Sequence, residues 1–128
     1  MELNLLLVDD SATVRGMITR ALRLAELPLG EIMQAANGVE ALGILEQKPV
    51  DVVLTDIHMP EMDGLTFIAH LRANPAFAGL PVIVVSTEGG AERMEEARRN
   101  GVTAYLRKPF TPEQVKEAVN SAVGAHHE

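Results

Sequence analysis

Short apolar runs recur along this chain and are separated by longer segments in which polar residues are frequent. The clearest runs lie at residues 3–8, 50–55 and 81–86 and are almost continuously apolar, which is typical of strands covered on both faces of a sheet. Residues 31–35 and 103–106 form two shorter strand candidates. The pattern therefore predicts five strands.

The segments between these runs carry apolar residues at the three- and four-residue spacing of a helix with one buried face. In the first helical segment we expect the inward positions to be Val14, Met17, Ile18, Ala21 and Leu22. The residues expected to face away from the sheet are Arg15, Thr19, Arg20 and Arg23. The last helical segment has a similar inner face, made of Val115, Ala118, Val119, Ala122 and Val123.

Residues that favour helix starts stand where the helical spacing begins. Asn37 is expected to cap the second helix, and Asp63 the third. Thr111 is the expected N-cap of the last helix, with Gln114 completing a capping box. The fourth helix, at residues 91–100, has only a thin apolar stripe and should pack weakly.

Strict alternation of five strands with five helices predicts an α/β fold, a five-stranded parallel sheet with helices on both faces. The length of 128 residues fits one domain, residues 1–128, without an effector domain. No apolar run approaches the roughly 20 residues of a membrane span. With no cysteine and no export signal, the cytoplasm is the expected compartment. A net charge of −7 argues against a general nucleic-acid binder.

Polar side chains follow four of the five predicted strands. Asp9 and Asp10 follow the first, Asp56 follows the third, Ser86 ends the fourth and Lys108 comes after the fifth. In parallel sheets of this kind, ligands bind beyond the carboxyl ends of the strands. We therefore expect these side chains to lie along one edge of the sheet.

Three carboxylates brought together repel one another, by about 4 kcal/mol for two unit charges 4 Å apart near a protein surface. Such a cluster persists if a divalent cation neutralises it or if one carboxyl stays protonated. Oxygen ligands without cysteine favour Mg²⁺. A carboxylate beside Mg²⁺, a lysine and a hydroxyl can attack phosphorus, so Asp56 is a candidate for aspartyl-phosphate formation. Taken singly, each residue is as well explained as a helix cap, a turn residue or a solvated surface group.

Four motifs, "LLLVDDS", "LTDIHMPEMDG", "VVSTE" and "YLRKPF", occur in this order and span most of the chain. Together they resemble the receiver domain of two-component response regulators, in particular stand-alone, CheY-like receivers. The resemblance implies a flavodoxin-like (βα)5 fold with strand order 2-1-3-4-5. It also implies that Asp56 accepts the phosphoryl group. Asp9, Asp10, Asp56 and the main-chain carbonyl of His58 would hold Mg²⁺.

The resemblance assigns the remaining motif residues to phosphate contact and switching. Lys108 would contact the phosphate and precede a cis peptide bond to Pro109. Ser86 would be the switch hydroxyl and Tyr105 the aromatic switch residue. Phosphorylation would then reshape the face formed by the fourth helix, the fifth strand and the fifth helix.

Such a protein is a phosphoacceptor that assists its own phosphorylation and dephosphorylation, and not an enzyme that turns over an external substrate. The expected donor is a sensor histidine kinase or a phosphotransfer protein. The expected output is the binding of a target protein. Chemotaxis, with a flagellar motor switch protein as the target, is one setting, and a phosphorelay is another.

Two other classes of protein use related folds. Phosphatases that form an aspartyl-phosphate usually carry a second carboxylate two residues after the nucleophile. Here that residue is His58 after Asp56 and Ala12 after Asp10. A flavodoxin-like cofactor binder would need a glycine-rich phosphate loop after the first strand, where this chain has "DDSAT". A receiver that acts only as a scaffold would not need the full acidic, hydroxyl and lysine set.

Overall fold

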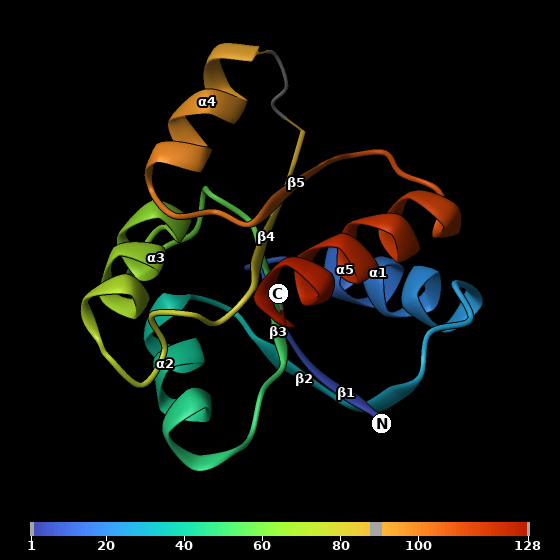
Figure 1. Ribbon diagram of the computed structural model, residues 1–128, viewed down its shortest axis with the longest axis horizontal. Coiled ribbons are helices and arrows are strands. Elements are labelled where there is room, and N and C mark those ends of the chain that lie inside the picture. The colour runs from blue at the N-terminus through green and yellow to red at the C-terminus, as the bar shows by residue number, and fades with distance from the viewer. Residues whose placement is uncertain (1, 88–90, 128) are drawn as a thin grey trace.

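The computed structural model describes residues 2–87 and 91–127, which form one five-stranded parallel sheet between two layers of helices (Figure 1). The order along the sheet is β2-β1-β3-β4-β5, which confirms the predicted fold and the strand order that the resemblance implied. The strands are β1 (Leu3–Val8), β2 (Leu29–Ala35), β3 (Val52–Thr55), β4 (Val82–Ser86) and β5 (Ala104–Arg107).

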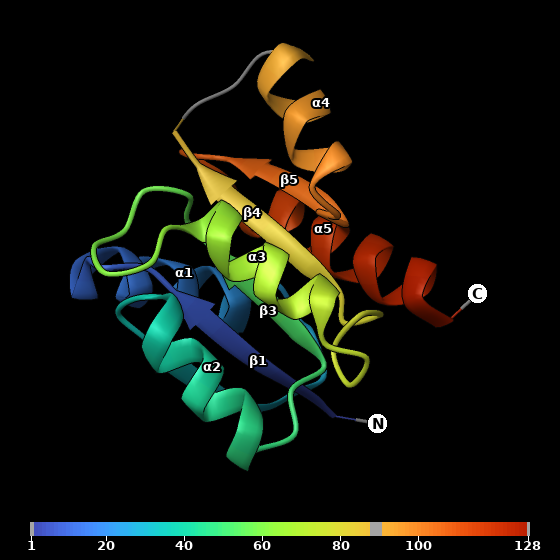
Figure 2. The ribbon, with the colours of Figure 1, turned by 90° about the vertical axis from the view of Figure 1, so that its left-hand side faces the viewer.

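Five helices connect the strands and cover both faces of the sheet. They are α1 (Ala12–Leu24), α2 (Gly38–Gln47), α3 (Gly64–Ala73), α4 (Ala91–Arg99) and α5 (Pro112–His127). Helices α2 and α3 lie on one face and α1 and α5 on the other, as Figure 2 shows. In β1, Leu5 and Leu7 pack toward α1 and α5, whereas Leu6 and Val8 pack toward α2 and α3. None of the helices within the described residues is long and apolar enough to cross a membrane.

Side-chain caps mark the starts of α1, α2, α3 and α5. Ser11 Oγ accepts a hydrogen bond from the amide of Val14, and Asn37 and Asp63 cap α2 and α3. Thr111 and Gln114 exchange the two hydrogen bonds of a capping box, of 3.2 and 2.9 Å, at the start of α5. These caps confirm the predicted helix starts.

Several predicted positions were wrong. Strand β2 starts at Leu29, two residues before the predicted start, so Gly30 lies within the strand. A β-carbon at Gly30 would come within 2.4 Å of Asn4 Oδ1. Strand β3 starts at Val52 rather than at residue 50, and β5 ends at Arg107. Met17, expected to face inward, is 63% exposed and lines an open groove together with Pro112 at the start of α5. Among the described side chains of α4, only Ala97 is buried.

Arg72, near the end of α3, joins that helix to two turns at the opposite edge of the sheet. Its guanidinium donates to the carbonyl of Gly101 at 3.0 and 2.7 Å, and to those of Phe77, Ala78 and Leu80 at 3.2, 3.1 and 2.8 Å. Gly101 has φ of 89°, and a β-carbon there would come within 2.9 Å of Arg72 Nε. The arginine therefore holds the turn after α4 in a conformation that glycine adopts readily.

Candidate functional site

Three carboxylates meet at the carboxyl edge of the sheet. Asp9 and Asp10 follow β1 and Asp56 follows β3, and one carboxylate oxygen of each lies within 4.8 Å of the others. Their exposure differs, since Asp9 is buried, Asp56 is partly buried and Asp10 is exposed. The structure therefore brings together the acidic residues selected from the sequence and leaves the cluster accessible from the side of Asp10.

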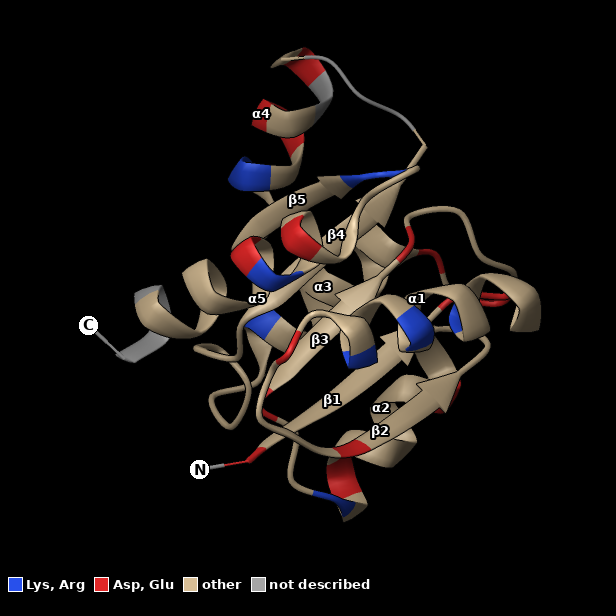
Figure 3. Ribbon diagram, turned by 90° about the vertical axis from the view of Figure 1, so that its right-hand side faces the viewer, with Lys and Arg blue, Asp and Glu red and all other residues tan. Residues whose placement is uncertain are grey.

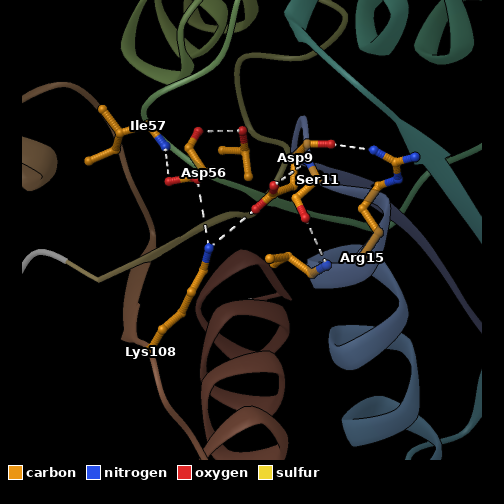
Figure 4. Close-up of polar contacts among 8 residues, drawn as sticks. Asp9, Ser11, Arg15, Asp56, Ile57 and Lys108 are labelled. Carbon is orange, nitrogen blue, oxygen red and sulfur yellow. Dashed lines mark hydrogen bonds and ion pairs between the residues drawn. The ribbon is translucent and has the colours of Figure 1, made fainter.

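Lys108, which follows β5, places a positive charge beside two of these carboxylates (Figure 4). Its Nζ lies 3.3 Å from Asp9 Oδ2 and 3.7 Å from Asp56 Oδ2, and its side chain is 18% exposed. The amide of Lys108 donates to the carbonyl of Ser86 at 2.8 Å, which anchors the lysine to the end of β4. The peptide bond between Lys108 and Pro109 is cis, as the resemblance implied.

The backbone around Asp56 holds its carboxylate in place. The amide of Asp56 donates to the carbonyl of Val8 at 2.9 Å, and Asp56 Oδ1 accepts from the amide of Ile57 at 2.7 Å. Burial has the largest effect on the Asp56 carboxyl and raises its pKa. The Ile57 amide and the charge of Lys108 favour the ionised form, whereas the charge of Asp9 opposes it. The raised pKa of Asp56 means that Lys108 and the neighbouring amide do not fully offset the cost of burying its negative charge.

Gly64, the first residue of α3, allows that helix to approach the backbone of Asp56. Its amide donates to the carbonyl of Ile57 at 2.6 Å. A β-carbon at Gly64 would lie 2.1 Å from the carbonyl oxygen of Asp56 and 2.8 Å from the α-carbon of Ile57. The sequence interpretation treated Gly64 only as part of a turn. Its place at the start of a helix gave no sign of a contact with Asp56.

The two predicted switch residues lie on neighbouring strands. Ser86 is the last residue of β4 and is 1% exposed, and it pairs in register with Arg107 of β5. Tyr105 of β5 pairs with Val84 and is partly buried on the face of the sheet where Ala97 of α4 packs. His58 is exposed in the loop after β3, and the metal-binding role of its carbonyl remains a prediction.

The donor set of the cluster suits a hard divalent cation. Asp9, Asp10 and Asp56 offer only carboxylate oxygens, which Mg²⁺ prefers and to which it binds while keeping several waters. The carboxylate of Asp9 is fixed by a hydrogen bond, which its Oδ1 accepts from the amide of Ser11 at 2.9 Å. The residues present therefore fit a magnesium ion.

Comparison with known proteins finds the same domain over most of the chain. A family model described as the response regulator receiver domain matches residues 5–120. The "Chemotaxis protein CheY homolog" of Campylobacter jejuni is 39% identical, over 95% of this chain and 93% of its own length. "Chemotaxis protein CheY1" of Helicobacter pylori is 38% identical, over 97% and 99%.

Solved structures of response regulators have a fold similar to that of this chain. The structure of the chemotaxis response regulator CheY4 of Vibrio cholerae has a TM-score of 0.85 at 31% identity and covers 95% of this chain and 99% of that one. A putative response regulator from Chloroflexus aurantiacus has a TM-score of 0.87 at 30% identity and covers 97% and 99%.

Without a metal ion, Asp56 should lower the stability of the folded protein at neutral pH. Its folded-state pKa lies above the ordinary value of 3.8, so the folded state binds more protons and stability falls as pH rises through that interval. We expect Asp56→Asn to be more stable than the wild type at pH 7 in the presence of chelator. The difference should shrink as pH falls toward 3.8, in urea unfolding at a series of pH values.

Asp63→Asn is the matched control for this pH series, because asparagine caps a helix about as well as aspartate and Asp63 lies outside the cluster. Measuring it over the same pH series shows the effect of losing a carboxylate outside the cluster. A gap for Asp56→Asn that stays constant or widens in acid would contradict the account.

Gly64→Ala should destabilise the protein by about 2–3 kcal/mol, because its β-carbon would meet backbone atoms that cannot move independently of Asp56. Chemical denaturation measures this loss, and the amide resonances of Asp56 and Ile57 should shift. Gly43→Ala in α2, where nothing lies within 4 Å of the added carbon, should instead stabilise by about 0.5–1 kcal/mol. Equal effects of the two substitutions would show that the close approach at Gly64 has no consequence.

Proposed function

This chain belongs to the response regulator receiver domain family, and we propose that it acts in two-component signalling by accepting a phosphoryl group on Asp56. The observation that carries this proposal is the contact of Asp56 with both a carboxylate cluster and Lys108. A carboxylate needs a nearby positive charge to approach a phosphoryl group. Lys108 provides one such charge at this edge of the sheet, and a cation bound by the carboxylate cluster would provide a second.

In the proposed transfer, an oxygen of Asp56 forms a bond to phosphorus while the bond from phosphorus to the donor's histidine nitrogen breaks. The nitrogen keeps the electron pair of that bond. Lys108 and the hydroxyl of Ser86 would donate hydrogen bonds to phosphoryl oxygens. Asp9, Asp10, Asp56 and the carbonyl of His58 would hold Mg²⁺, which supplies positive charge to offset the carboxylates and the phosphoryl group.

The proposed output is a change in the face formed by α4, β5 and α5. Ser86 would move toward the phosphoryl group, and Tyr105 would turn inward. The weak burial of α4 supports this, because a helix held by few buried side chains rearranges at low cost. Figure 1 shows α4 beside β5 at the margin of the molecule.

The proposed partners are a histidine kinase or phosphotransfer protein as donor and a target protein that binds the switched face. The names of the Campylobacter and Helicobacter relatives support chemotaxis as the setting, with a flagellar motor switch protein as the target. We place this exchange in the cytoplasm. The protein would assist its own phosphorylation and dephosphorylation without turning over an external substrate.

Phosphorylation is tested by incubating the wild type and Asp56→Asn with acetyl phosphate or phosphoramidate in the presence of Mg²⁺. We expect intact-mass analysis to show one added phosphoryl group on the wild type and none on Asp56→Asn. The label should disappear when chelator replaces Mg²⁺. A label that persists in Asp56→Asn would overturn the assignment of the nucleophile.

Switching is tested by adding the phosphoryl mimic beryllium fluoride together with Mg²⁺ and recording backbone amide shifts. We expect larger shifts in residues 86–106, which include α4 and most of β5, than in α1, because the switch residues lie on β4 and β5. Asp56→Asn under the same conditions is the control, and its shifts should not be larger in residues 86–106 than in α1. Shifts of equal size in α1 and in residues 86–106 would count against a switch on this face.

A further inference from the structure

Arg15 of α1 connects the acidic turn after β1 to the edge strand β2. Its Nη1 donates a hydrogen bond to the main-chain carbonyl of Asp9, as Figure 4 shows, and its Nε donates to Gln34 Oε1 at 2.9 Å. The helical pattern predicted that this arginine faces away from the sheet, and it did not predict the contact with Asp9. The side chain runs back along the helix toward the start of α1, where the candidate site lies.

The contact with the carbonyl acts on two metal-site residues at once. The carbonyl of Asp9 belongs to the peptide unit that leads into Asp10, and a peptide unit is planar. Holding that carbonyl therefore sets the direction in which the chain enters Asp10. The carboxylate of Asp9 is held separately, with Oδ1 accepting from the amide of Ser11 at 2.9 Å and Oδ2 lying 3.3 Å from Lys108 Nζ.

We propose that Arg15 is a positioning residue for metal binding, whose planar fork holds the peptide between Asp9 and Asp10 against Gln34. The inference rests on the proposed magnesium site. A guanidinium can satisfy the carbonyl and the Gln34 oxygen together because its Nε and Nη1 donors are fixed in one plane, whereas a lysine offers one flexible ammonium without that fork.

The charge of Arg15 and its geometry have opposite effects on a cation. A positive charge next to Asp9 repels Mg²⁺, so if charge were its only influence, removing Arg15 would tighten binding. If Arg15 positions the ligands, removing it loosens the turn and weakens binding. Loss of a side chain that orients a metal ligand typically weakens affinity by roughly 10- to 100-fold. The sign of the change therefore separates the two roles.

The test is an NMR titration of the metal-free protein with MgCl₂, for the wild type, Arg15→Ala and Arg15→Lys. Arg20→Ala is the matched control, because Arg20 is an exposed arginine of the same helix and α1 contains no acidic residue. Figure 3 shows the basic segments of α1 in blue. We expect the Kd for Mg²⁺ to rise roughly 10-fold in Arg15→Ala and to rise also in Arg15→Lys. Arg20→Ala should bind as the wild type does or slightly more tightly.

A second measurement uses the same proteins without metal. Both Arg15 variants should exchange the amide proton of Ser11 faster than the wild type, because that amide bonds to Asp9 in the turn that Arg15 holds. If the Arg15 variants fail to fold, Gln34→Ala carries the test, since it removes one end of the fork. Weaker Mg²⁺ binding by Gln34→Ala supports the inference, and unchanged binding overturns it.

The outcomes distinguish this inference from the proposed function. Mg²⁺ binding by Arg15→Ala or Arg15→Lys that equals or exceeds wild-type binding overturns the positioning role and leaves the proposed function intact. A wild-type protein that binds no Mg²⁺ overturns the magnesium site and the positioning role together.

Discussion

Repulsion among Asp9, Asp10 and Asp56 is the constraint on which the arrangement of this edge depends. Parallel pairing of β1 with β3, from Leu5 and Val52 to Val8 and Thr55, brings the two strand ends together and places an oxygen of each carboxylate within 4.8 Å of the others. Lys108 offsets part of the repulsion, and burial keeps the pKa of Asp56 raised. The apolar layers on both faces of the sheet stabilise a cluster that would be unfavourable alone. The contacts of Ser11 and Arg15 restrict the turn after β1, and the close approach of Gly64 restricts the backbone of Asp56.

Local signals in the sequence predicted the fold well because each one has a direct structural cause. Continuous apolar runs correspond to strands buried on both faces, and Asn37, Asp63 and Thr111 cap helices through hydrogen bonds to nearby amides. The convergence of Asp9, Asp10, Asp56 and Lys108 followed from one topological rule, that the carboxyl ends of parallel strands share an edge. The sequence could therefore predict which residues meet, although their roles came from the family resemblance.

Contacts between distant backbone groups could not be predicted in this way. Helical spacing assigned Arg15 to the outer face, but a long side chain can turn along the helix and reach the Asp9 carbonyl. Arg72 likewise donates to carbonyls in two turns that are separated from it in sequence by up to 29 residues. Met17 satisfied the apolar spacing yet lies exposed at the groove that Pro112 also lines. These features depend on how elements pack, which a pattern along one segment does not contain.

The central claim is that the three carboxylates form a cation site in which Asp56 takes part. The most direct test measures the free energy of unfolding at neutral pH as MgCl₂ is added to the wild type and to Asp56→Asn. A ligand bound only by the folded state should stabilise the wild type by roughly 1.4 kcal/mol when its concentration is ten times Kd. The account predicts this gain for the wild type and a clearly smaller one for Asp56→Asn at the same concentration. Equal gains for the two proteins, or none for the wild type, would contradict it.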